Sequence, residues 1–160
     1  MVSSNVDATV QSALSAYQRL STDEKLAFLW YVYTKMGTSI TPAAPGAAGD
    51  EIAKGLFNQV KELSHEEQLQ VQRQIIEKQD SLIGREYGSL SENTKLLFWY
   101  YLAQGMEEGV IIPMPENYEP SGSIQKLLSD IEACDFEQQI TFLREAVIDA
   151  GQEPKSGAEI

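Results

Sequence analysis

Few side chains in this sequence are suited to bond chemistry. The single histidine, His65, begins the string His-Glu-Glu-Gln-Leu, which resembles the first half of a zinc-protease motif. The motif needs a second histidine where this chain has Leu69, so a metal site there lacks a ligand. The sequence also has no phosphate-binding glycine loop, nucleophile elbow or Cys-x-x-Cys pair. These residues predict a protein that is not an enzyme.

The aromatic side chains are concentrated in two short blocks. Both Trp residues and six of the twelve Phe and Tyr residues lie in residues 28–33 and 98–101. At about 100° per residue, Trp30 shares one helix face with Leu26 and Tyr33, whereas other apolar residues of its block point the opposite way. The second block has the same property. Both predicted helices are therefore apolar on two sides.

A helix with two apolar faces has two interpretations. It is either a central helix of the core or a helix that borders a second apolar body. Trp and Tyr carry N–H and O–H groups that need partners when buried, and their flat rings lie well against a long conjugated molecule. These types favour a cavity wall. Pro113-Met114-Pro115 and Tyr118 follow the second block closely and are placed to close one end of it. Met is adaptable and suits contact with an apolar ligand, and gap filling is the alternative for Met106 and Met114.

Helix signals dominate the chain, and strand-like alternation is nearly absent. Four capping boxes are predicted, in which a cap residue and the residue three positions on satisfy each other's backbone N–H groups. They are Ser21–Glu24, Ser64–Glu67, Ser89–Glu92 and Asp135–Gln138. Glycines at 37, 109 and 151 follow three of the helical segments, where they favour a helix end. The predicted helices span residues 6–19, 22–36, 50–62, 65–79, 80–87, 91–108, 122–133 and 136–150.

Proline-containing segments interrupt this pattern. Residues 38–49 and 110–122 are predicted to be compact connections between helices. An internal echo is also present, because the pattern of residues 20–31 recurs in residues 90–101 at an offset of 70. The echo indicates two related helical halves packed together.

Composition limits the function classes. The 160 residues correspond to one domain, and a net charge of −12 repels nucleic acid and anionic lipid headgroups. The lone Cys134 cannot form an internal disulfide, and the start of the chain lacks a secretory signal. No apolar run approaches the roughly 20 residues that a membrane helix needs. We expect a soluble cytoplasmic protein that neither spans a membrane nor binds nucleic acid.

Several strings resemble those of one known family. They include Leu26-Ala27 with Trp30 and Tyr33, Phe98-Trp99-Tyr100, Pro115-Glu116 with Tyr118, the segment 43–48, and residues 138–141 with Leu143-Arg144. The sequence resembles the N-terminal helical domain of the cyanobacterial orange carotenoid protein and, in extent, the stand-alone helical carotenoid proteins. The resemblance covers residues 10–151.

This resemblance implies a fold and a ligand. The fold is all-α, an orthogonal bundle of two interleaved helical sub-bundles, with residues 1–151 as the carotenoid-binding domain and 152–160 as a flexible tail. The ligand is one keto-carotenoid threaded between the sub-bundles, canthaxanthin foremost, with echinenone and 3′-hydroxyechinenone as alternatives. The implied lining positions are Leu26, Leu29, Trp30, Tyr33, Leu96, Trp99, Tyr100, Met106, Met114, Pro115 and Tyr118.

The sequence departs from the family pattern near these positions. Gln72 and Arg73 stand where the family has Met and Cys, so this part of the wall is expected to be more polar or turned outward. Met114 replaces an Ile and Ala103 a Gly, which concerns the tuning of ligand colour. The chain leaves no room for the family's C-terminal sensor domain, so we do not expect reversible photoswitching.

The leading hypothesis is photoprotection, by quenching of singlet oxygen or by carrying carotenoid, including handover to a separate partner that resembles the sensor domain. The alternative is a module that docks on the phycobilisome, the light-harvesting antenna near the thylakoid, and quenches its excitation. Arg144 would then meet the partner, although an ordinary exposed arginine is an equal interpretation. The third hypothesis is a structural helical domain that binds no pigment. Chloride is associated with relatives, but the sequence assigns it to no residue.

Overall fold

This computed structural model describes residues 8–36, 47–115, 117–148 and 150. Within these residues the chain forms eight α-helices and no strand, as predicted. They are α1 (Ala8–Gln18), α2 (Thr22–Met36), α3 (Ala47–Lys61), α4 (His65–Ile76), α5 (Leu82–Gly88), α6 (Glu92–Glu108), α7 (Gly122–Glu132) and α8 (Phe136–Ile148).

Two predicted boundaries differ from the structure for local reasons. Helix α4 ends before residue 79 because Lys78 has a φ of 59°, which the helix cannot accommodate. Helix α5 begins after Ser81, whose Oγ accepts the N–H of Gly84 at 2.8 Å. Residues 47–49, predicted as part of a connection, belong to α3. The rest of that connection, Gly37, and the tail with Gly151 lie outside the described residues.

Three of the four predicted capping boxes are confirmed, at residues 21–24, 64–67 and 135–138. The fourth, Ser89–Glu92, is wrong. Ser89 follows α5 and its hydroxyl donates to the Arg85 carbonyl at 3.2 Å, whereas Ser91 is the N-cap of α6 and accepts from the N–H of Thr94. At its other end, α6 stops as predicted at Gly109, where a φ of 84° favours glycine.

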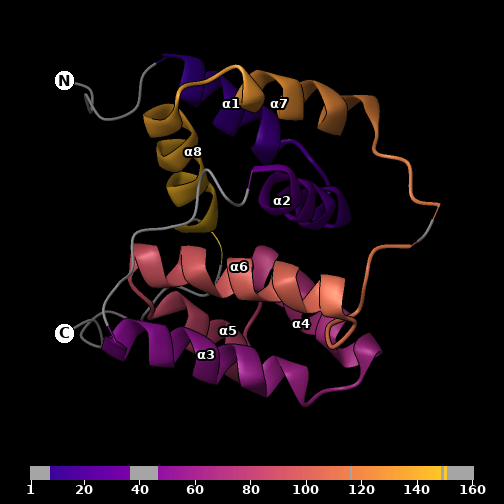
Figure 1. Cartoon of the computed structure of the whole chain (residues 1–160), viewed down its shortest axis with the longest axis vertical. Helices are drawn as coiled ribbons and strands as arrows, with labels where there is room; N and C mark the ends of the chain where they lie inside the picture. The colour runs from indigo at the N-terminus through magenta and orange to yellow at the C-terminus, as the bar shows by residue number, and fades with distance from the viewer. Residues whose placement is uncertain (1–7, 37–46, 116, 149, 151–160) are drawn as a thin grey trace.

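The helices form two sub-bundles that are interleaved in the sequence (Figure 1). Helices α1, α2, α7 and α8 pack together, and α3 to α6, inserted between α2 and α7, form the second group. The sub-bundles meet where α2 packs against α4 and α6, and where α6 packs against α8. This surface, called the interface below, contains the aromatic helices α2 and α6.

The internal echo extends from sequence into structure. The rings of Tyr17 and Phe28 lie 5.7 Å apart between centroids, and those of Tyr87 and Phe98, 70 positions later, lie 5.6 Å apart. A lysine ammonium lies over the tyrosine ring in each half, at 5.5 and 5.4 Å. The packing repeats as well, since α2 contacts α4 and α7 as α6 contacts α8 and α3. Helices α1–α4 and α5–α8 are therefore two related halves. Each sub-bundle contains two helices from each half.

The two serines before α6 provide a matched test of the corrected cap. We expect Ser91→Ala to lower the free energy of unfolding by about 1 kcal/mol, because it removes the acceptor of the Thr94 N–H. Ser89→Ala should change it by less than about 0.5 kcal/mol, because this exposed hydroxyl only donates to a carbonyl at the end of α5. Urea unfolding measures both values, and equal losses would contradict the assignment.

Candidate functional site

A slot lies along the interface between the sub-bundles and has two adjoining compartments. The mouth compartment has a volume of about 220 Å³ and reaches the exposed prolines after α6, and the inner compartment has about 10 Å³. Leu26, Gln72 and Met106 line both and form the junction. The mouth is completed by Asp23, Ala27, Leu69, Arg73, Ile112, Pro113, Met114, Pro115 and Tyr118, and the inner compartment by Leu29, Trp30, Tyr33, Trp99, Leu102 and Ala103.

Helical periodicity places these side chains on common faces. On α2, Leu26, Trp30 and Tyr33 follow the i, i+4, i+7 spacing, and on α6 residues 99, 103 and 106 repeat it. The opposite face of α2 carries Phe28, which is fully buried against Tyr17 in its own sub-bundle. Each aromatic helix therefore contributes one face to a core and the other to the slot, which explains its two apolar sides.

The polar atoms of two slot rings are bonded away from the slot. The Tyr33 hydroxyl donates to the Leu96 carbonyl at 3.0 Å, and Trp99 Nε1 donates to the Tyr87 hydroxyl at 2.7 Å. Tyr87 in turn donates to the carbonyl of Val147 on α8, also at 2.7 Å. Burial raises the pKa values of Tyr33 and Tyr87, so both phenols stay neutral. These bonds fix the rings of Tyr33 and Trp99 as an apolar wall.

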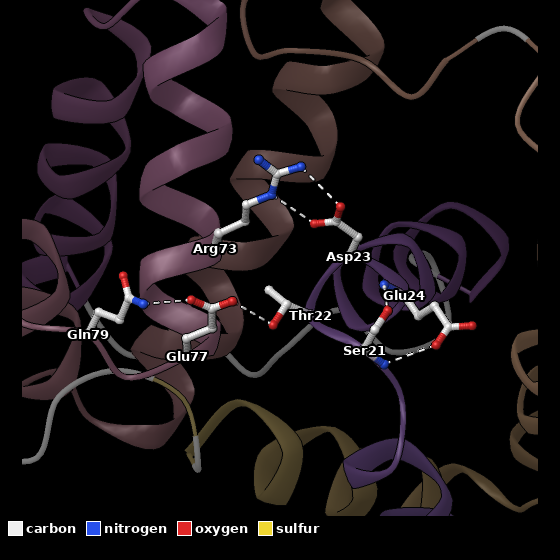
Figure 2. Close-up of polar contacts among 7 residues, drawn as sticks. All are labelled: Ser21, Thr22, Asp23, Glu24, Arg73, Glu77 and Gln79. Carbon is white, nitrogen blue, oxygen red and sulfur yellow. Dashed lines mark hydrogen bonds and ion pairs between the residues drawn. The ribbon is translucent and has the colours of Figure 1, made fainter.

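An ion pair borders the mouth and joins the sub-bundles. Figure 2 shows this pair between α2 and α4. Arg73 on α4 donates from Nε and Nη2 to the two carboxylate oxygens of Asp23 on α2, at 2.8 and 3.0 Å. Beside it, Thr22 donates to Glu77 at 2.9 Å. The hydrogen bonds from Arg73 lower the pKa of the Asp23 carboxyl. The interface is thus polar at this edge and apolar inside.

The other half of the repeat has a similar contact, in which the arginine pairs with a neutral amide instead of a carboxylate. Asn93 on α6 corresponds to Asp23 at the offset of 70. Along α4 and α8 the offset is 71, as their N-caps Ser64 and Asp135 show, so Arg144 corresponds to Arg73. Arg144 donates from Nη2 to Asn93 Oδ1 at 3.3 Å, and its buried Nε has no acceptor among the described residues. Arg144 is half-buried at the contact of α6 and α8, outside the slot. Its role toward a partner stays a prediction.

The structure brings most of the sequence-predicted lining residues together. Nine positions line one or both compartments; Leu96 and Tyr100 lie outside both. Leu96 is buried and supplies the carbonyl that anchors Tyr33. The ring of Tyr100 lies 6.4 Å from that of Tyr33, and its hydroxyl accepts from Gln104. Contact of any of these residues with a pigment stays a prediction.

The predicted list of lining residues contains none from α4, although this part of the wall, at Gln72 and Arg73, was expected to be more polar or turned outward. Leu69 and Gln72 line the slot from this helix, and Gln72 is only 5% exposed. Gln72 makes the wall more polar, whereas Arg73 lies at the rim. The signal was the i, i+3, i+7 spacing of Leu69, Gln72 and Ile76, which puts the glutamine on the apolar face of its helix.

The chain matches a known protein family over nearly its whole length. The family model described as the N-terminal domain of the orange carotenoid protein matches residues 3–153. The chain belongs to this family. An orange carotenoid-binding domain-containing protein of Nostoc sp. is 49% identical over 145 residues, which cover 91% of this chain and 85% of that protein.

Solved structures of relatives have the same fold. The Anabaena (Nostoc) red carotenoid protein binding canthaxanthin is 48% identical, with a TM-score of 0.81 over 91% of this chain and 99% of that one. The Anabaena orange carotenoid protein binding canthaxanthin is 38% identical, with a TM-score of 0.81 over 90% of this chain and 46% of that one. The all-helical fold of the orange carotenoid protein N-terminal domain is therefore confirmed.

Length distinguishes the relatives. The orange carotenoid-binding protein of Limnospira maxima is 37% identical, but the match covers 89% of this chain and only 45% of that protein.

In the part of the chain that the structure describes, no helix has the length and apolar character needed to cross a membrane.

The Tyr87 hydroxyl gives a test of how the slot wall is held. We expect Tyr87→Phe to lower the free energy of unfolding by about 1–3 kcal/mol, because Trp99 Nε1 and the Val147 carbonyl both lose a buried partner. Tyr118→Phe is the control, since the hydroxyl of this half-buried mouth residue makes no hydrogen bond to another described residue. Chemical denaturation measures both. A Tyr87→Phe variant as stable as the control would refute the anchoring role.

The two arginine pairs predict opposite changes in the free energy of unfolding when their acidic and amide partners are replaced, and both changes depend on pH. Because the pKa of Asp23 is lowered in the folded state, its pair with Arg73 stabilises above the unfolded pKa near 4 and is lost as pH falls through the folded value. Asp23→Asn should therefore reduce stability at pH 7 by less than about 1 kcal/mol, given the exposure of both partners, and by less at pH 3.

The reciprocal change, Asn93→Asp, should stabilise at pH 7 by a similar amount, because a carboxylate offers Arg144 Nε the acceptor that it lacks. Urea unfolding at pH 7 and pH 3 measures both variants. Effects of the same sign for the two substitutions, or effects that do not shrink at pH 3, would refute this account of the pairs.

Proposed function

We propose that this protein is a water-soluble holder of one keto-carotenoid, with canthaxanthin as the first candidate, which protects against light by quenching singlet oxygen and carries the pigment. The observation that carries the proposal is the aromatic-walled slot between the sub-bundles. Membership of the family and the canthaxanthin of two related structures support the ligand class. A bound carotenoid supplies a low-lying triplet state that takes up excitation energy and releases it as heat.

The side chains of the slot fit a long apolar ligand. Aromatic and aliphatic groups form most of both compartments, and the charged pair of Asp23 and Arg73 stands at the rim. Face contact with Trp30, Tyr33 and Trp99 favours a conjugated chain through dispersion along its length. No group in this arrangement has to form or break a bond.

Uptake of such a ligand requires the slot to widen. The inner compartment, at about 10 Å³, is smaller than the space a polyene needs, whereas the mouth is already open. Tyr33 and Trp99 are held by hydrogen bonds, so the movement falls to the side chains at the junction. Leu26 and the unbranched, adaptable Met106 meet there. We infer that these two make room while the anchored rings keep their orientation.

The experiment is expression in a canthaxanthin-producing host, followed by a visible spectrum and mass spectrometry of the extracted pigment. A pigmented protein that shortens the lifetime of singlet oxygen relative to the pigment-free protein supports the proposal. A colourless product that also takes up no canthaxanthin from solution overturns it. Fluorescence of isolated phycobilisomes on addition of the pigmented protein separates antenna quenching, which would lower it, from the proposed role, which leaves it unchanged.

Blocking the inner compartment gives the matched variant. Ala103 is 8% exposed and faces the slot, so Ala103→Leu should fill the inner compartment and cost pigment binding about 1–3 kcal/mol, which is roughly a fivefold to 150-fold loss of affinity. Leu82→Ala, at a side chain that is 77% exposed and outside the slot, is the control and should bind as the wild type. Canthaxanthin titration followed by absorbance measures both. If the two variants bind equally well, pigment does not enter the inner compartment.

A further inference from the structure

Two N–H donors in the wall of the inner compartment lack acceptors. Trp30 Nε1 and Gln72 Nε2 are buried, and neither has a hydrogen-bond partner among the described residues. The other polar rings of this compartment, Tyr33 and Trp99, both donate to internal acceptors. An unpaired buried donor is costly, because folding removes it from water without replacing that bond. The missing acceptors therefore call for an explanation at this place.

The other buried glutamines of the described chain show that unpaired amides are exceptional here. Gln68, on the same helix as Gln72, donates to the carbonyls of Leu63 and Val110 at 3.2 and 3.0 Å and accepts from the N–H of Ile112. Gln139, the equivalent of Gln68 in the second half, donates to the Ile131 carbonyl at 3.0 Å. These amides bind a loop and a helix end. Gln72, equally buried, has no such structural task.

The position of Gln72 indicates where its partner would come from. It lines both compartments and stands at the junction, where its neighbours in the wall are the apolar Leu26 and Met106. No described residue accepts a hydrogen bond from its Nε2, so an acceptor carried by the ligand would complete this donor. An oxygen atom on an otherwise apolar ligand satisfies the donor without charging the slot.

We propose that Gln72 donates a hydrogen bond to a ring carbonyl oxygen of the ligand and so selects an oxygenated carotenoid over a hydrocarbon one. The inference rests on the proposed function and adds the residue that determines specificity. Trp30 Nε1 is a second donor in the same compartment. A hydrocarbon carotene leaves both donors unpaired, whereas a keto-carotenoid satisfies at least one. Discrimination of this kind comes from the unpaired group left behind by the wrong ligand.

The test compares canthaxanthin with β-carotene, which has the same length and no oxygen, in the wild type and in Gln72→Met. The methionine keeps the length of the side chain and removes the donor. We expect the wild type to prefer canthaxanthin and Gln72→Met to lose about tenfold of that preference, with affinity for β-carotene kept. Gln70→Met, on the exposed side of α4, is the matched control and should keep the full preference.

Two further readouts separate a ligand contact from a structural role. The carbonyl stretch of bound canthaxanthin should shift to higher frequency in Gln72→Met, because the carbonyl loses its donor. Without pigment, the variant should unfold at a higher temperature than the wild type, because it no longer buries an unpaired amide. An unchanged stretch, an equal loss of both ligands, a wild type without preference, or a less stable pigment-free variant would each overturn the role of Gln72. A wild type that binds neither carotenoid overturns the proposed function itself.

Discussion

The structure depends on the double apolar character of α2 and α6. Each helix buries one face in its own sub-bundle, through Phe28 in one case and Phe98 in the other, and turns its second face to the interface. An interface made this way cannot close as a core does, since two of the large rings that line it are already held, Tyr33 by α6 across the interface and Trp99 by α5 within its own sub-bundle. Tyr33 and Trp99 are fixed by hydrogen bonds to Leu96 and Tyr87, so they cannot rotate to fill the gap between the sub-bundles. The slot is the consequence of that anchoring.

Cohesion between the sub-bundles is divided between the edge and the interior. At the mouth, the Asp23–Arg73 pair and the bond from Thr22 to Glu77 join α2 to α4. In the interior, the bond from Tyr33 to Leu96 joins α2 to α6, and the bond from Tyr87 to Val147 joins α5 to α8. The edge contacts are exposed and contribute little each, whereas the interior bonds are buried and costly to break. Widening of the slot therefore meets least resistance at the mouth, next to the prolines that follow α6.

Sequence patterns predicted the helices well because their signals are local. Caps such as Ser64 and Asp135, the stop at Gly109, and the periodicity of α2 and α6 each act within a few residues. The error at Ser89 arose because two serines two positions apart both precede α6, yet the offset of 70 from Ser21 points to Ser91. The place of Gln72 on the apolar face of α4 has a local signal, the spacing of Leu69, Gln72 and Ile76. Its place in the slot depends on how α4 is rotated against α2, which is a tertiary property.

The repeat explains why the slot is asymmetric although the two halves are related. Asp23 and Asn93 occupy equivalent positions, but only Asp23 carries a charge, so Arg73 is doubly bonded while the Nε of Arg144 has no described acceptor. The same comparison holds inside, since Gln72 corresponds to the buried Leu143. One half therefore places an ion pair and an amide at the α2–α4 contact, and the other places an unsatisfied arginine at the α6–α8 contact. Among the described residues, three buried side-chain donors are unpaired. Trp30 Nε1 and Gln72 Nε2 line the slot and Arg144 Nε lies outside it, so under the proposed function an elongated ligand would meet a free donor only on the α2–α4 side.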